Sequence, residues 1–137
     1  MTDSLGNVTV LTYEDPASGT VEIQPAPDAA IAMIAQMIAE LDGTTRTLVT
    51  VSGRGDSHVA VGGDATSGLV VYATFDNQTF YTLLNPAADP QETVEVVAGG
   101  QPARYPAHKV VPLDIATHAA IAFAQDGRLA EDCYWDT

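Results

Sequence analysis

The chain has 137 residues and a mass of 14.3 kDa, a size that predicts one domain over residues 1–137. Apolar residues make up 46% of the chain, which is enough to fill a core and excludes a disordered protein. Five Lys and Arg residues against 18 Asp and Glu residues give a net charge of −13. Such a surface repels phosphate, so we expect no direct binding to nucleic acid or to an anionic membrane.

The N-terminal part of the chain predicts two strands and a helix. Apolar and polar residues alternate over residues 7–13, the period of a strand, and residues 20–24 follow as a second strand after a turn. Asp28 suits a helix N-terminus, and the Ala-rich run that follows it predicts a helix ending at residues 41–43.

That helix is apolar over most of its surface. Its main face predicts packing against a sheet, and Met33 and Met37 form a second apolar row, so only Gln36 and Glu40 are expected to face water. An alternative is that the methionine row binds an amphipathic segment, as in an acidic chaperone or adaptor for a secreted effector. The main face comprises Ile31, Ile34, Ile38 and Leu41.

From residue 45 onward the sequence changes to β-branched runs separated by Gly, Asp and Asn. These runs predict consecutive antiparallel strands, with turns at residues 53–56, 62–64 and 76–78. The predicted strands cover residues 47–52, 57–61, 68–75, 79–84 and 92–98, and a shorter extended piece covers residues 103–105.

The C-terminal part predicts a second helix and a short strand. Pro112 can occupy the first turn of this helix with Asp114 near its positive end, Gly127 ends it, and residues 133–135 form a strand-like stub. The whole pattern predicts an α+β fold. We expect an antiparallel sheet meander with two helices packed on it, in the order ββα-βββββ(β)-α.

Cysteine usage and the N-terminus bear on the cell compartment. Cys133 is the only cysteine, which excludes a scaffold held by internal disulfides. The N-terminus has neither the basic start nor the apolar run of a signal peptide, and the apolar stretch over residues 29–41 is shorter than the ~20 residues of a membrane span. We therefore expect a cytoplasmic protein.

Candidate catalytic and metal-binding groups are few. Asp114 precedes His118 by four residues, so this pair could orient and activate Cys133 in a small cytoplasmic enzyme. The alternative is a solvated helix pair and a buried cysteine. His58 and His108 provide no close ligand pair of the kind that a zinc site uses, and no glycine-rich phosphate loop is present, so we expect neither a metal nor a cofactor.

The strongest local signal is a group of acids around two aromatic residues at the C-terminus. Aromatic anchors ringed by carboxylates suit an interface that captures a basic protein. Trp135 could instead close the core, with the acids simply solvated. The partner-binding candidates are Asp126, Glu131, Asp132, Trp135 and Asp136, with Tyr72, Asp64 and Asp76 as second choices, the last two forming a weaker cluster in predicted loops.

Four segments in order resemble a known family. They are His58-Val-Ala-Val-Gly-Gly, Gly68-Leu-Val-Val-Tyr72, Val110-Val-Pro-Leu-Asp-Ile-Ala116 and Ala122-Phe-Ala-Gln-Asp-Gly127-Arg-Leu, the last leading to Trp135. Together they are similar to the Imm1 family of immunity proteins from bacterial polymorphic toxin systems. The resemblance covers the chain from Leu48 onward.

The resemblance implies a non-enzymatic protein made in the cytoplasm beside a toxin, which it neutralises by tight binding. Members often cover the active site of a nuclease or a nucleic-acid deaminase. The resemblance brings no catalytic residues; the family's C-terminal Trp corresponds to Trp135, and its PLD motif to Pro112, Leu113 and Asp114. The expected partner is a cognate toxin domain with a basic cleft, which a chain of net charge −13 can occupy with carboxylates.

Overall fold

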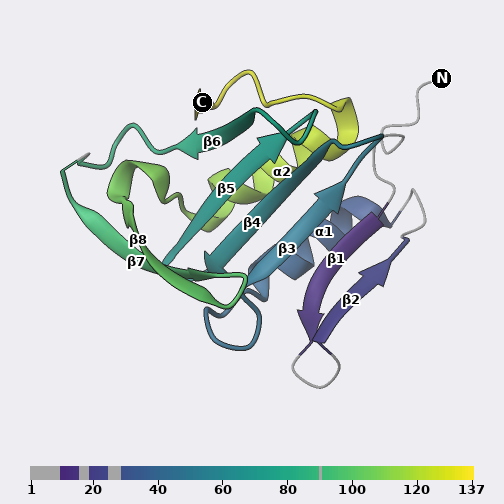
Figure 1. Ribbon diagram of the computed structural model, residues 1–137, viewed down its shortest axis with the longest axis horizontal. Coiled ribbons are helices and arrows are strands. Elements are labelled where there is room, and N and C mark those ends of the chain that lie inside the picture. Colours follow the sequence, from purple (N-terminus) through teal and green to yellow (C-terminus); the bar gives the residue numbers. More distant parts are fainter. Residues whose placement is uncertain (1–9, 16–18, 25–28, 90) are drawn as a thin grey trace.

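The computed structural model describes residues 10–15, 19–24, 29–89 and 91–137. These residues form an α+β fold with a seven-stranded antiparallel sheet, as the sequence predicts (Figure 1). The strands of this large sheet are β1 (Val10–Asp15), β2 (Gly19–Ile23), β3 (Leu48–Ser52), β4 (His58–Asp64), β5 (Gly68–Thr74), β6 (Phe80–Leu84) and β9 (Tyr134–Asp136). They lie in the order β2-β1-β3-β4-β5-β6-β9.

Two helices, α1 (Ala30–Ala39) and α2 (Leu113–Asp126), lie side by side behind the large sheet in Figure 1. α2 packs over β4 and β5, and α1 packs over β3, so the main core lies between the helices and one face of the sheet. α2 ends where the sequence predicts, because Gly127 adopts a φ of 69° and its N–H donates to the carbonyl oxygen of Phe123. None of the helices in the described part of the chain has the length and apolar run that a membrane crossing needs.

The face of the large sheet that points away from the helices is here called the open face. Side chains alternate between the two faces along each strand, so the apolar core residues of β3, β4 and β5 point toward the helices. A row of directly paired residues crosses the open face from one edge strand to the other. This row consists of Glu22, Thr12, Thr50, Ala60, Tyr72, Thr82 and Asp136.

A second, two-stranded sheet covers part of the open face. It is the hairpin of β7 (Thr93–Ala98) and β8 (Gln101–Pro106), which packs on β4 and β5 and buries Val70 and Val96 in a small second core (Figure 1). The prediction that residues 92–98 extend the meander is therefore wrong. The position beside β6 is taken by β9, and β7 pairs with the neighbouring segment that follows it along the chain.

The prediction of a turn at residues 62–64 is also wrong, because these residues belong to β4. A Cβ atom at Gly62 would lie 2.5 Å from the Cβ of Ala98, and one at Gly63 would lie 2.8 Å from a methyl carbon of Val96. Close approach of the hairpin therefore requires glycine at position 62, and at position 63 it adds to a positive φ of 118° and to the carbonyl oxygen of Gly68 at 2.6 Å. The hairpin is further held by a bond of 2.8 Å from the N–H of Gly100 to the hydroxyl of the buried Thr47.

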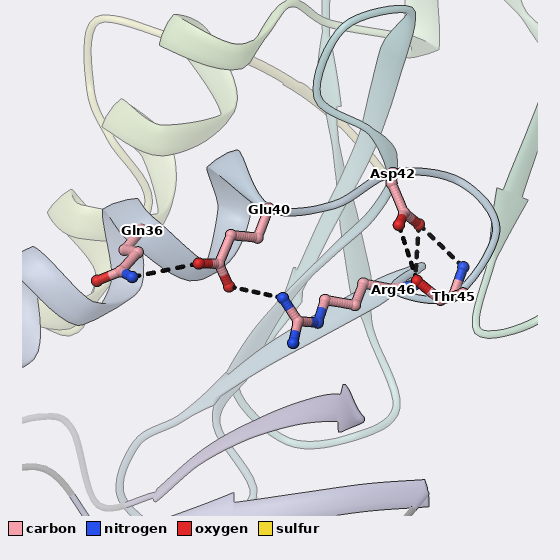
Figure 2. Close-up of polar contacts among 5 residues, drawn as sticks. All are labelled: Gln36, Glu40, Asp42, Thr45 and Arg46. Atoms are coloured by element: carbon pink, nitrogen blue, oxygen red, sulfur yellow. Dashed lines mark hydrogen bonds and ion pairs between the residues drawn. The ribbon is translucent and has the colours of Figure 1, made fainter. Parts of the chain in front are cut away.

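The connection between α1 and β3 is organised by one carboxylate (Figure 2). Asp42 accepts hydrogen bonds of 2.9 Å from the backbone N–H groups of Thr44, Thr45 and Arg46, and one of 2.8 Å from the hydroxyl of Thr45. The N–H of Arg46, followed by that of Thr44, holds the pKa of this carboxyl far below its usual range. The Arg46 guanidinium lies 3.0 Å from Glu40, so this cation is already paired.

Smaller differences concern the ends of elements. α1 is shorter than predicted at both ends, and Asp28 lies outside the described residues. Ala32 and Ala39 are exposed in addition to Gln36 and Glu40, because α1 turns one edge to solvent. The extended piece expected at residues 103–105 is the full strand β8, whose pairing with β7 cannot be inferred from its own short apolar pattern.

Candidate functional site

The acids at the C-terminal end of the chain gather around the end of α2. Asp126 is the last residue of α2, and Glu131 and Asp132 lie in the turn before β9, all three exposed. Together with Arg128 and His118 they line a surface pocket of about 310 Å³. The structure therefore brings three of the five first-choice residues together, with one arginine among them.

Asp132 is fixed by a partner on α2. Its Oδ1 lies 2.9 Å from Nε2 of His118, and this hydrogen bond is the main reason that the pKa of Asp132 lies below its usual range. Both side chains are largely exposed. The pair ties the C-terminal segment to α2 and keeps Asp132 ionised.

The three residues of the enzyme alternative line one pocket of about 380 Å³, namely Asp114, His118 and Cys133. The predicted orienting pair is not formed, however, because His118 bonds Asp132, and Oδ1 of Asp114 accepts a bond from the N–H of Ile115. Burial, and then the Asp132 charge, raise the pKa of the Cys133 thiol. A thiol held protonated is a poor nucleophile, so this arrangement does not favour cysteine catalysis.

The same corner holds a set of side chains that could ligate a metal. The ligand atoms of His118, Asp132 and Cys133 lie within 4.8 Å of one another. Sequence spacing missed this set because its members come from α2 and from a segment that is adjacent only in space. Two of the three side chains are exposed, and exposed groups often gather in this way without an ion, so we assign no metal here.

Trp135 points toward the helices and packs against the main core, where it is partly buried. Its indole N–H donates a bond of 3.2 Å to the carbonyl oxygen of Ala130. Both groups of the side chain, the ring and the N–H, therefore have partners within the chain.

Asp136 lies apart from the other C-terminal acids. Since it follows Trp135 on β9, its side chain points to the open face, in the same paired row as Tyr72. Its carboxylate lies 3.7 Å from the Lys109 ammonium, a partly exposed pair of small energetic value. The structure thus places Asp136 and Tyr72 on one surface, although they are far apart in sequence.

Asp64 and Asp76 do not form one cluster, contrary to the sequence-based expectation. Asp64 pairs with Gly68 at the start of β5, whereas Asp76 follows the opposite end of that strand. Each caps its own turn. The Thr66 hydroxyl lowers the pKa of Asp64, and the N–H groups of Thr79 and Gln78 lower the pKa of Asp76.

Among the exposed aromatic residues of the open face, the sequence predicted Tyr72 as a contact but not Phe80. Tyr72 is in edge contact with His58 and with Phe80, with ring centroids 6.3 Å and 5.9 Å apart. Tyr72 is 37% exposed and Phe80 is 41% exposed. The alternation along β6 places Phe80 on the face opposite to the buried Leu83. This alternation alone does not reveal which face of the sheet other elements cover.

The methionine row does not form a groove of its own. Met33 and Met37 are partly buried and pack against the main core. An apolar groove does lie between the two helices, lined on α1 by Ala35 and Ala39 and on α2 by residues that include Leu113, Thr117 and Ile121. The part of the methionine row that packs against the core is not available to an amphipathic segment.

Comparison with known proteins places the chain in a family. The model of the family described as "Immunity protein Imm1" matches residues 13–137. No curated protein and no solved structure gives a significant match. Because the family match spans nearly all of the described sheet and both helices, the chain belongs to the Imm1 family of immunity proteins.

Proposed function

We propose that the protein neutralises a cognate toxin domain by covering the toxin's basic active-site region, without chemistry of its own. Membership of an immunity-protein family over residues 13–137 is the observation on which this rests. The toxin class that suits a partner of net charge −13 is a nuclease or a nucleic-acid deaminase, since such enzymes bind phosphate with Lys and Arg. Carboxylates of the immunity protein would then lie where phosphates lie during catalysis.

The first-choice contacts are the exposed acids around the end of α2, Asp126, Glu131 and Asp132, followed by Asp136 on β9. Their number and exposure suit electrostatic steering of a basic partner. Trp135 would contribute as a support beneath this surface, because its ring packs against the core and its N–H bonds Ala130. Tyr72, Asp64 and Asp76 are second-choice contacts.

The direct test is calorimetric titration of the full chain with the C-terminal domain of the toxin encoded beside it, at low and at high salt. We expect one-to-one binding in the nanomolar class that weakens as salt rises. Absence of binding at either salt would contradict the proposal.

A double variant that neutralises two acids tests where the acidic contacts lie. The variant Asp126→Asn/Glu131→Gln should weaken binding by at least about tenfold if toxin cations lie against these groups. The matched control is Glu92→Gln/Glu95→Gln, which removes the same charge from exposed positions at β7. Equal losses in both variants would mean that only net charge matters and that the C-terminal acids make no specific contact.

The variant Trp135→Ala tests whether Trp135 supports the fold or contacts the toxin directly. Truncating a packed Trp costs about 3–5 kcal/mol, and partial exposure here favours the lower end. We expect a lower midpoint of unfolding, with binding retained under conditions where the variant is folded. A variant of unchanged stability that no longer binds would make Trp135 a direct contact.

A further inference from the structure

The open face carries two large aromatic side chains that belong to neither hydrophobic core cluster. The hairpin β7–β8 covers Gly62 and Val70 of this face, and beyond it the paired row is made mostly of small or polar residues such as Thr12, Thr50 and Thr82. A sheet face that is exposed to water normally carries small or polar residues of this kind. Tyr72 and Phe80 depart from this pattern, although they contribute little to either core cluster.

These two rings and His58 form what we call the aromatic patch. The three residues come from the adjacent strands β4, β5 and β6, and the edge contacts of Tyr72 with His58 and Phe80 hold the rings in place. Because central strands are rigid and each ring has only two side-chain torsions, little conformational entropy is lost when a partner covers it. Preorganised, half-exposed aromatic residues are typical of the residues that dominate binding energy.

Three carboxylates lie in the strands and turns next to the aromatic patch. Asp136 lies two strands from Tyr72 in the same paired row, and Asp56 and Asp76 lie in the turns next to His58 and Phe80. Asp76 is held by the N–H groups of Thr79 and Gln78 at 2.9 Å, which fixes its position.

Two cations also lie near this face. Arg54 is in the turn that contains Asp56, and Lys109 is paired with Asp136. Three carboxylates against these two cations leave a small negative excess, which suits a basic partner with an apolar or guanidinium group to bury. An Arg side chain can stack on a Tyr or Phe ring while its nitrogen atoms reach a carboxylate.

We propose that the aromatic patch on the open face is the anchor of the toxin-binding surface, with Tyr72 and Phe80 stacking against basic side chains of the toxin. This inference rests on the proposed function and moves its main holding contacts from the acids around α2 to the open face. The acids around α2 then steer the encounter, and the open face supplies the contacts that hold the complex. Burial of the rings on binding, not their charge environment alone, sets the lifetime of the complex.

The chain offers a matched pair of variants for the test. Phe80→Ala removes a ring that is 41% exposed on the open face, and Phe75→Ala removes one that is 39% exposed but stacks on Phe123 of α2, on the helix side. Both variants and Tyr72→Ala are titrated against the same toxin domain, with unfolding midpoints measured in parallel. We expect Phe80→Ala and Tyr72→Ala each to weaken binding by at least about thirtyfold and Phe75→Ala to leave it within about threefold.

A second variant avoids dependence on ring removal. Thr82→Arg places a cation in the paired row between Tyr72 and Asp136 and should abolish binding through charge and bulk, with the fold retained because position 82 is at the surface of the sheet. If the wild type binds and all open-face variants bind equally well, the anchor proposal is overturned while the immunity function stands. If the wild type itself does not bind, the proposed function fails first.

The same protein samples also test whether a second copy of this chain covers the aromatic patch. Should a second copy of this chain cover the aromatic patch, the wild type would sediment as a dimer and Phe80→Ala as a monomer. That result would also overturn the proposal, because the rings would be buried before the toxin arrives. A monomeric wild type that loses toxin affinity on ring removal supports it.

Discussion

At the scale of single residues, the carboxylates of this chain have different roles despite their similar appearance in sequence. Asp42, Asp64 and Asp76 accept backbone hydrogen bonds within their own turns, whereas Asp126 and Glu131 are exposed around a pocket. The first group stabilises connections of the fold, and Asp64 and Asp76 are in addition proposed as second-choice contacts. The second group is proposed as part of the first-choice contact surface.

Asp42 provides a pH-dependent test of this division. Its pKa is depressed in the folded chain, so its contribution to stability is present above the unfolded value of about 3.9 and is lost as pH falls through the folded value. Asp42→Asn should therefore lower the unfolding midpoint at neutral pH, and the difference from wild type should narrow below about pH 4. Thermal unfolding followed by circular dichroism over this range measures it. The control Asp56→Asn removes the same charge, and an equal effect there would contradict the role of Asp42.

Cys133 tests the enzyme alternative. Burial and the Asp132 carboxylate raise the pKa of its thiol, so alkylation at neutral pH should be slower than for an unhindered cysteine. Asp132→Asn should move the pH dependence of alkylation to lower pH, because it removes one of the two causes. Cys133→Ala should leave toxin neutralisation unchanged. Loss of neutralisation by a folded Cys133→Ala would return attention to the pocket shared with His118 and Asp114.

At the scale of elements, local periodicity predicted most strands and both helices, and the short turns predicted the pairing of neighbouring strands only from β3 to β6. The alternation in residues 47–84 is a property of each strand, and short turns then make sequential strands pair. β7 breaks this rule because β9, more than forty residues later in the chain, already pairs with β6. Pairing between strands so far apart in sequence depends on tertiary packing, which a local residue pattern cannot predict.

Gly62 tests whether the hairpin β7–β8 is seated as described. Gly62→Ala should destabilise the protein by about 1–3 kcal/mol, since the new methyl group would meet the Cβ of Ala98. Ala98→Gly removes that atom, so the double variant should recover part of the loss. Denaturant unfolding of the four proteins gives the coupling. Additive losses would show that the two positions do not touch.

At the scale of the whole molecule, the excess of acids predicts how the complex forms. With a net charge of −13, the association rate with a basic toxin should fall by at least about tenfold between about 0.01 M and about 1 M salt. Asp126→Asn/Glu131→Gln should lower the association rate, whereas Tyr72→Ala and Phe80→Ala should mainly raise the dissociation rate. Stopped-flow measurements separate the two. An association rate that does not change with salt concentration would contradict electrostatic steering.

The candidate site could be predicted only in part from the sequence. Family motifs and acidity pointed to a binding protein, and the acids of residues 126–132 do gather around one pocket. Trp135 was selected for its residue type, but its ring faces the core because β9 pairs with β6 in a register that turns Asp136 outward instead. Phe80 was not selected, since its exposure depends on how far a distant hairpin reaches over the sheet.

The sequence by itself determined the α+β class, the strand-forming segments, both helices and the family, because side-chain periodicity, turn residues and motifs act over short stretches of chain. Only the tertiary structure decided that β7–β8 leaves the main sheet, that His118 pairs with Asp132, and that an aromatic patch stays uncovered on the open face. Each of these depends on which distant segments pack together. Packing of that kind is settled by the burial of apolar surface over the whole molecule.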